Sequence, residues 1–167
     1  MAAKEKALDD LFEETLKDIF YAENKILKAL PKMAKAAQSE ELKAAFEKHL
    51  KETEGQVSRL EKVFDMIEVA PRGKKCEAIE GMIEEGAEIM KEFKGAPALD
   101  AGLVSAAQAV EHYEIARYGT LKRWAEQLGL DEAAGLLEET LEEEKNTDQA
   151  LTELADATIN EHAQAAE

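Results

Sequence analysis

The sequence has few aromatic residues, three prolines and a single cysteine. Aromatic residues make up 5% of the chain, and its commonest residues are Ala, Glu, Lys and Leu, which favour helix over strand. Cys76 has no partner for an internal disulfide, and the N-terminal segment lacks the apolar run of a signal peptide. No segment approaches the roughly 18 apolar residues that a membrane span needs. We therefore expect a helical, cytoplasmic protein with no membrane partner.

Positive charge is also scarce. The 167 residues include 37 acidic and 21 basic side chains, which gives a formal net charge of −16. A surface of this sign repels nucleic acids and anionic lipids, both of which bind clustered Lys and Arg. We therefore expect no nucleic-acid partner. A chain of this length can form one domain, since such domains bury roughly two-thirds of the surface that the unfolded chain exposes.

Apolar residues recur at helical spacing in five segments separated by turn and cap residues. The pattern predicts four long helices at about 6–37, 40–68, 98–128 and 131–159, a shorter helix at about 76–93, and a frayed tail at 161–167. Ser39 is the expected N-cap of the second helix. Two hairpins of long helices joined by a connection of roughly thirty residues are typical of ferritin-like chains. The prediction is one all-α domain over residues 1–160, a ferritin-like antiparallel four-helix bundle with an additional crossover helix.

Several acids interrupt the apolar faces of these helices. An α-helix turns about 100° per residue, which places Glu23 and Glu114 at the centre of their apolar faces and Glu111 on the flank. Glu144 and Asp148 interrupt the apolar row of the last long helix. The second helix offers three further polar residues at corresponding positions: His49 and Gln56 inward, and Glu52 on the flank. Counted from the hairpin turns, Glu23, Glu52 to Gln56, Glu114 and Glu144 fall in the same middle layer.

Each of these residues alone has a simpler interpretation. A lone glutamate more often reaches solvent from the flank, and a lone histidine such as His49 is more often hydrogen-bonded in a core. Four or more buried carboxylates would each cost several kcal/mol unless protonated or neutralised. Arg117, at the edge of its apolar face, can neutralise at most one of them. Two divalent ions would balance four carboxylates, and oxygen ligands with an occasional imidazole suit iron, manganese or zinc.

The sequence thus predicts two metal ions, with iron as the first choice. Glu23, Glu52, Glu114 and Glu144 are the expected ligands, and a second set completes the site: His49, Gln56, Glu111 and Asp148. The general diiron pattern pairs a lone Glu on two helices with Glu-x-x-His on the other two. Here the second helix carries His49-x-x-Glu52, and Asp148 follows Glu144 by four residues. The ligand set is therefore richer in oxygen than the general pattern, which favours metal binding more than redox activity.

Long segments of the chain resemble a known family. They include LDDLFEETLKDIFYAENKILKALPKMA, HLKETEGQVSRLEKVF and VEHYEIARYGTLKRWAEQLG. In combination these segments resemble the YciE/YciF family of bacterial ferritin-like stress proteins. The resemblance implies a four-helix bundle with an extra crossover helix, a tendency to dimerise, similarity to the diiron part of rubrerythrin, and a link to stress response. It implies no settled activity.

Two functional hypotheses stay open on the sequence. The first is a non-haem dinuclear iron protein that consumes peroxide or oxygen while oxidising ferrous iron. The alternative is a non-enzymatic structural or interaction protein that keeps the bundle with a degenerate metal site, in which the buried acids are protonated or hydrated.

The segment 76–93 bears on assembly. This segment carries more apolar residues along one face than a helix needs to pack against a closed bundle: Ile79, Met82, Ile83, Ile89, Met90 and Phe93. We therefore expect a homodimer that forms in part through this helix, because two-fold dimers are the commonest soluble homo-oligomers. The alternative is that the helix lies flat on its own bundle and the chain is a monomer.

Overall fold

The structure, a computed structural model, describes residues 5–164, and those residues form helices and no strand. The elements are α1 (Leu8–Ala36), α2 (Glu40–Met66), α3 (Glu77–Glu92), α4 (Leu99–Gln127), α5 (Asp131–Leu154), a short π-helix η1 (Ala155–Ile159) and α6 (Asn160–Gln164). The all-α prediction is confirmed. No helix among the described residues combines the length and apolar character needed to cross a membrane.

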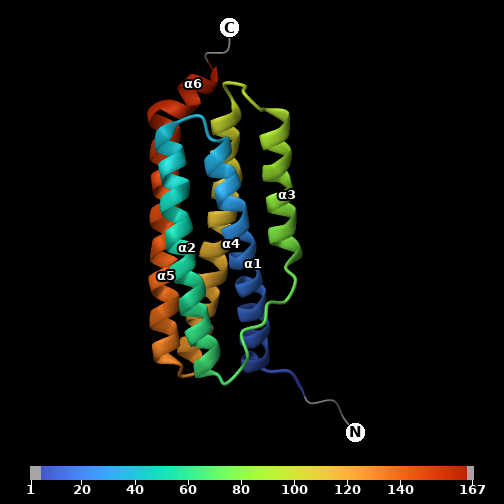
Figure 1. Cartoon of the computed structure of the whole chain (residues 1–167). Helices are drawn as coiled ribbons and strands as arrows, with labels where there is room; N and C mark the ends of the chain where they lie inside the picture. The colour runs from blue at the N-terminus through green and yellow to red at the C-terminus, as the bar shows by residue number, and fades with distance from the viewer. Residues whose placement is uncertain (1–4, 165–167) are drawn as a thin grey trace.

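The long helices pack side by side. α1 contacts α2 and α4, and α5 contacts α2 and α4 (Figure 1). Turns at residues 37–39 and 128–130 join α1 to α2 and α4 to α5, so each pair runs in opposite directions (Figure 1). α3 stands at the side of this group and packs against α4 and α1 (Figure 1).

The turn between α1 and α2 is fastened to α4. The Ser39 hydroxyl accepts a hydrogen bond from the Leu42 amide at 3.2 Å, which confirms Ser39 as the N-cap of α2. The buried carboxylate of Asp100 on α4 accepts the backbone N–H groups of Gln38 and Ser39 at 2.8 and 2.7 Å. These charge-assisted hydrogen bonds fasten the turn between α1 and α2 to the first turn of α4.

Two glycines allow close approaches around α3. A Cβ at Gly73, in the connection before α3, would lie 3.0 Å from the Cβ of Tyr21, so the connection can run against α1 only without a side chain there. A Cβ at Gly102 would lie 2.6 Å from the Cγ2 of Ile89, which brings α3 close to α4. α3 is therefore held against both neighbours by backbone packing.

The apolar stripe of α3 faces mainly its own chain. Ile79 is fully buried, and four further residues are partly buried against the core: Met82, Ile83, Ile89 and Met90. Phe93 is the exception, with 42% of its surface exposed. The part of the stripe left for another molecule is thus smaller than the sequence pattern indicates.

The C-terminal end differs from the prediction. The last long helix changes from α to π geometry at Ala155, and residues 161–164, expected to be frayed, belong to α6. Ala155 and Ile159 are buried, and η1 and α6 both contact α4, so apolar packing holds this end in place. Residues 165–167 of the predicted tail lie outside the described residues.

Candidate metal centre

The core contains a layer of polar side chains about halfway along the long helices. Glu23, Glu114 and Glu144 have no exposed surface, and Glu111 is 2% exposed. Each lies among apolar residues of its own helix; on α1, for example, Ile19 and Ile26 flank Glu23 and are both buried. A helix that buries these neighbours must turn the acid inward as well.

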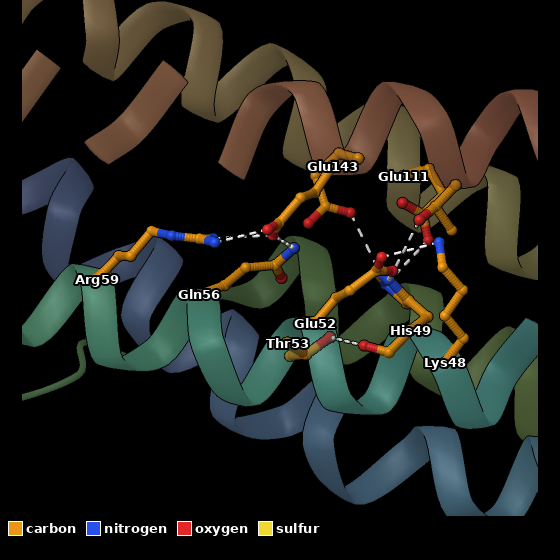
Figure 2. Close-up of polar contacts among 10 residues, drawn as sticks. Lys48, His49, Glu52, Thr53, Gln56, Arg59, Glu111 and Glu143 are labelled. Carbon is orange, nitrogen blue, oxygen red and sulfur yellow. Dashed lines mark hydrogen bonds and ion pairs between the residues drawn. The ribbon is translucent and has the colours of Figure 1, made fainter. Parts of the chain in front are cut away.

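Four side chains of this layer converge. One ligand-type atom from each of His49, Glu111, Glu114 and Glu144 lies within 4.8 Å of all the others. The Nε2 atom of His49 on α2 is 3.2 Å from Glu111 Oε1 on α4 and 3.8 Å from Glu144 Oε2 on α5. Figure 2 shows the His49 ring directed from α2 toward Glu111. The group brings three carboxylates and one imidazole to a single point between three helices.

Hydrogen bonding is incomplete in this layer. Within residues 5–164, the buried side-chain nitrogen and oxygen atoms without a hydrogen-bond partner are Glu23 Oε2, His49 Nε2, Glu52 Oε2, Gln56 Oε1, Glu111 Oε2, and both carboxylate oxygens of Glu114 and Glu144. Every one of these atoms belongs to the layer. Buried polar atoms without partners cost free energy, and carboxylate oxygens with one imidazole nitrogen form a donor set that suits a divalent metal. The residues present therefore fit a metal ion.

Burial raises the pKa values of the acids in this layer. Burial, together with repulsion from Glu144, raises the pKa of Glu23 to about 8. Burial is the largest cause for Glu111 and Glu114 too, whose pKa values lie well above the ordinary range, and the pKa of Glu144 is raised. No Lys or Arg among the described residues forms an ion pair with any of these four acids. Burial therefore favours the protonated form of each of these acids unless a cation is bound.

Glu52 and Thr147 lie beside the Nδ1 atom of His49. The Nδ1 atom of His49 lies 3.8 Å from Glu52 Oε2 and 3.5 Å from Thr147 Oγ1, which leaves Nε2 facing the acids. The interaction with His49, aided by Lys48 at 2.8 Å, lowers the pKa of Glu52 to about 2. Metal-binding histidines commonly place their other ring nitrogen against a carboxylate in this way.

The eight predicted ligands do not all meet. His49, Glu111, Glu114 and Glu144 form the convergent group, and Glu52 lies beside it. Two others are buried in the layer but outside the group: Glu23, which accepts a hydrogen bond from Tyr118, and Gln56, which donates to Glu143 at 3.0 Å.

Asp148 is partly buried at the edge of the layer and lies outside the convergent group. Its carboxylate accepts a hydrogen bond from Gln108 at 3.0 Å and lies 3.1 Å from the ring of His112. Four residues after Glu144, a helix has turned about 40° past a full revolution, which is enough to bring Asp148 to the α4 side. Asp148 thus links α4 to α5 at the edge of the layer.

The sequence analysis did not identify three residues near the centre: Tyr118, Arg59 and Glu143. Tyr118 is fully buried one turn after Glu114 on the same face, and that spacing was an available signal. Arg59 donates to both carboxylate oxygens of Glu143 at 2.8 and 2.6 Å (Figure 2). Arg59 follows Gln56 by three residues, but its length lets it reach from the flank, so helical position alone does not reveal this pair.

The comparisons with known proteins agree with this fold. The family described as "Domain of unknown function (DUF892)" matches residues 7–164. The chain is 46% identical to Protein YciF of Escherichia coli (strain K12) over 160 residues, which cover 95% of this chain and 96% of that protein.

Solved structures show the same similarity. The crystal structure of the E. coli stress protein YciF superposes with a TM-score of 0.89 at 46% identity, over 93% of this chain and 99% of that one. YcfI of Rhodopseudomonas palustris superposes with a TM-score of 0.85 at 44% identity, over 91% and 97% of the two chains. A protein of Xanthomonas campestris pv. campestris at 23% identity shares the fold, with a TM-score of 0.72 over 94% and 95% of the two chains. The resemblance read from the sequence is confirmed: the chain belongs to the DUF892 family and is similar to YciF.

Proposed function

We propose that this protein binds two divalent metal ions, with iron as the first choice and manganese or zinc as alternatives, in the polar layer of a ferritin-like bundle. The bundle is an antiparallel four-helix arrangement of α1, α2, α4 and α5, and α3 is its crossover helix. The observation that carries the proposal is the set of buried, unpartnered carboxylate oxygens at the centre. Four buried acids without a Lys or Arg partner match the charge of two divalent ions.

The residues divide into those that would hold metal and those that position them. His49, Glu111, Glu114 and Glu144 offer convergent donor atoms, and Glu23 offers a further unpartnered oxygen. Tyr118 and Glu52 position proposed ligands. Tyr118 donates a hydrogen bond to Glu23, and Glu52 lies against the His49 ring.

Arg59 has a related role at the edge of the layer. It neutralises Glu143, whose carboxylate would otherwise add to the negative charge next to the centre. Bound iron would supply the electrons for reducing oxygen or peroxide. Because the similar protein YciF is described as a stress protein, we assign this chain to a stress response, and we place it in the cytoplasm as the sequence predicts.

Metal titration tests the proposal. Metal-free protein titrated anaerobically with Fe²⁺ is expected to bind two ions per chain, as measured by calorimetry and metal analysis. Glu114→Gln removes a carboxylate charge at the centre and is expected to weaken binding at least tenfold. Glu61→Gln, at an exposed position of α2, is the matched control and should leave binding unchanged.

A failure to bind Fe²⁺, Mn²⁺ or Zn²⁺ would contradict the proposal. The acid layer would then be a protonated structural feature, and the non-enzymatic alternative would stand.

A homodimer is part of the same proposal. Phe93 at the end of α3 is 42% exposed, so an apolar contact at this helix remains for a second copy. Light scattering after size exclusion should give twice the 18.5 kDa of the chain. Phe93→Glu is expected to shift the mass to that of a monomer, whereas Leu11→Glu, at another large exposed apolar residue, should not. A monomeric wild-type protein at micromolar concentration would refute the dimer.

A further inference from the structure

An apolar cavity lies between α1, α3 and α4 and leads toward the metal centre. Its volume is about 240 Å³, and its walls are formed chiefly by Ile26, Met33, Met82, Ile83, Met90 and Val110. The inner end reaches His49 and Glu111, two members of the convergent group. In Figure 1 this is the region where α3 stands beside α1 and α4. A cavity of this size exceeds the roughly 150 Å³ that suffices to hold a benzene molecule in an apolar core.

The outer end of the cavity is positively charged. Lys28 and Lys32 lie one turn apart on α1, line the cavity and are exposed. Neither forms an ion pair with any residue of the part of the chain that the structure describes. The third lysine of this rim, Lys25, pairs with Glu80 of α3 at 2.7 Å. Lys28 and Lys32 place two positive charges at the mouth, which favour an anionic group over a metal ion at this entrance.

We propose that this cavity binds a linear amphipathic carboxylate of medium chain length. The carboxylate pairs with Lys28 and Lys32 at the rim, and the alkyl chain lies along the apolar walls toward His49. Flexible methionines such as Met33, Met82 and Met90 suit an alkyl chain because they adapt to its shape. Pockets for small molecules commonly combine apolar walls with a few polar groups at one end.

This inference goes beyond the metal centre and does not rest on it. The lining comes chiefly from apolar residues of α1, α3 and α4, and the rim from Lys28 and Lys32. The far end of a bound chain would nevertheless lie next to the residues proposed to hold metal. A neutral gas or peroxide gains no binding energy from the positive charges of Lys28 and Lys32. A negatively charged amphiphile does, and it is therefore the favoured occupant.

The binding test uses the metal-free protein and two probes of equal chain length and opposite charge. Decanoate, kept below its micelle-forming concentration, is expected to bind saturably at one molecule per chain in a calorimetric titration. Decyltrimethylammonium should bind at least tenfold more weakly because Lys28 and Lys32 repel it. The absence of saturable decanoate binding, or equal binding of the two probes, would overturn the proposal.

A variant that fills the cavity locates the site. A Cβ at Gly86, which lines the cavity, would touch only Ala106 Cβ at 3.7 Å, an ordinary contact, so a larger side chain can extend into the space. Gly86→Leu is expected to weaken decanoate binding at least tenfold. Gly81→Leu, at an exposed position of the same helix with open space around it, should leave binding unchanged. Equal binding by Gly86→Leu and wild-type protein would also overturn the proposal.

A second variant does not disturb the core. Reversing both rim charges with Lys28→Glu and Lys32→Glu should weaken decanoate binding at least tenfold and improve binding of decyltrimethylammonium. Lys51→Glu with Lys62→Glu makes the same change in net charge at exposed positions of α2 and should do neither. Fe²⁺ titration of Gly86→Leu reads out the metal centre separately, so failure of one proposal is distinguishable from failure of the other.

Discussion

The metal-free protein is expected to lose stability as the pH rises from about 4.5 to about 8. The pKa of Glu23 rises from an ordinary value of 4.5 to about 8 on folding, and those of Glu111, Glu114 and Glu144 are raised as well. Between these pH values the folded state binds more protons than the unfolded state, so stability falls with increasing pH. The contribution is complete below pH 4.5 and lost above about pH 8. We expect a decrease on the order of a few kcal/mol.

Bound metal should reverse this dependence. Metal coordinates deprotonated carboxylates, so its binding releases protons and tightens as the pH rises. Urea unfolding at pH 5, 6.5 and 8, with chelator and with saturating Mn²⁺, measures both slopes. Glu52 contributes in the opposite sense, but its pKa of about 2 confines that effect to acid below the window. A metal-free protein whose stability is flat or rising from pH 5 to pH 8 would contradict the burial of charged acids.

Helical position predicted the direction of the buried acids well. Glu23 and Glu114 lie at the centre of apolar faces, and both are fully buried. Direction is set by the backbone, since a helix that buries one face must bury every residue on it. The pattern did not show how far a side chain extends from its helix or which residue it meets. Arg59 lies on a flank, yet its long side chain meets Glu143, while Asp148 is turned just far enough to pair with α4.

The role of α3 shows a second limit of periodicity. The spacing of Met82, Ile83 and Met90 correctly identified an apolar face, but a pattern within one helix does not say which molecule covers it. In the structure, α1 and α4 cover most of that face, and close packing at Gly102 holds the helix in place. The cavity depends on how three helices approach one another, and no single segment of the sequence carries that information.

Replacing Glu114 by Leu is expected to stabilise the metal-free protein and to remove metal-dependent stabilisation. Both carboxylate oxygens of Glu114 are buried and unpartnered, so leucine, of similar volume, removes the cost of a buried acid that lies beside Glu23, Glu111 and Glu144. At pH 8 the free energy of unfolding should rise by about 2–4 kcal/mol. Added Mn²⁺, which stabilises the wild-type protein by binding the folded state, should no longer do so. Urea unfolding with and without Mn²⁺ measures both effects.

Glu23→Leu provides an internal comparison, because this acid does have a partner. The buried hydroxyl of Tyr118 donates to Glu23, so leucine at this position leaves that hydroxyl unpaired at a cost of about 1–3 kcal/mol. The gain in stability should therefore be smaller than for Glu114→Leu, and adding Tyr118→Phe should restore it. Glu61→Leu, at an exposed position of α2, controls for apolar substitution and should change stability by less than about 0.5 kcal/mol. Destabilisation of the metal-free protein by Glu114→Leu would show that the acid makes contacts important to the fold, and would count against a layer built to receive cations.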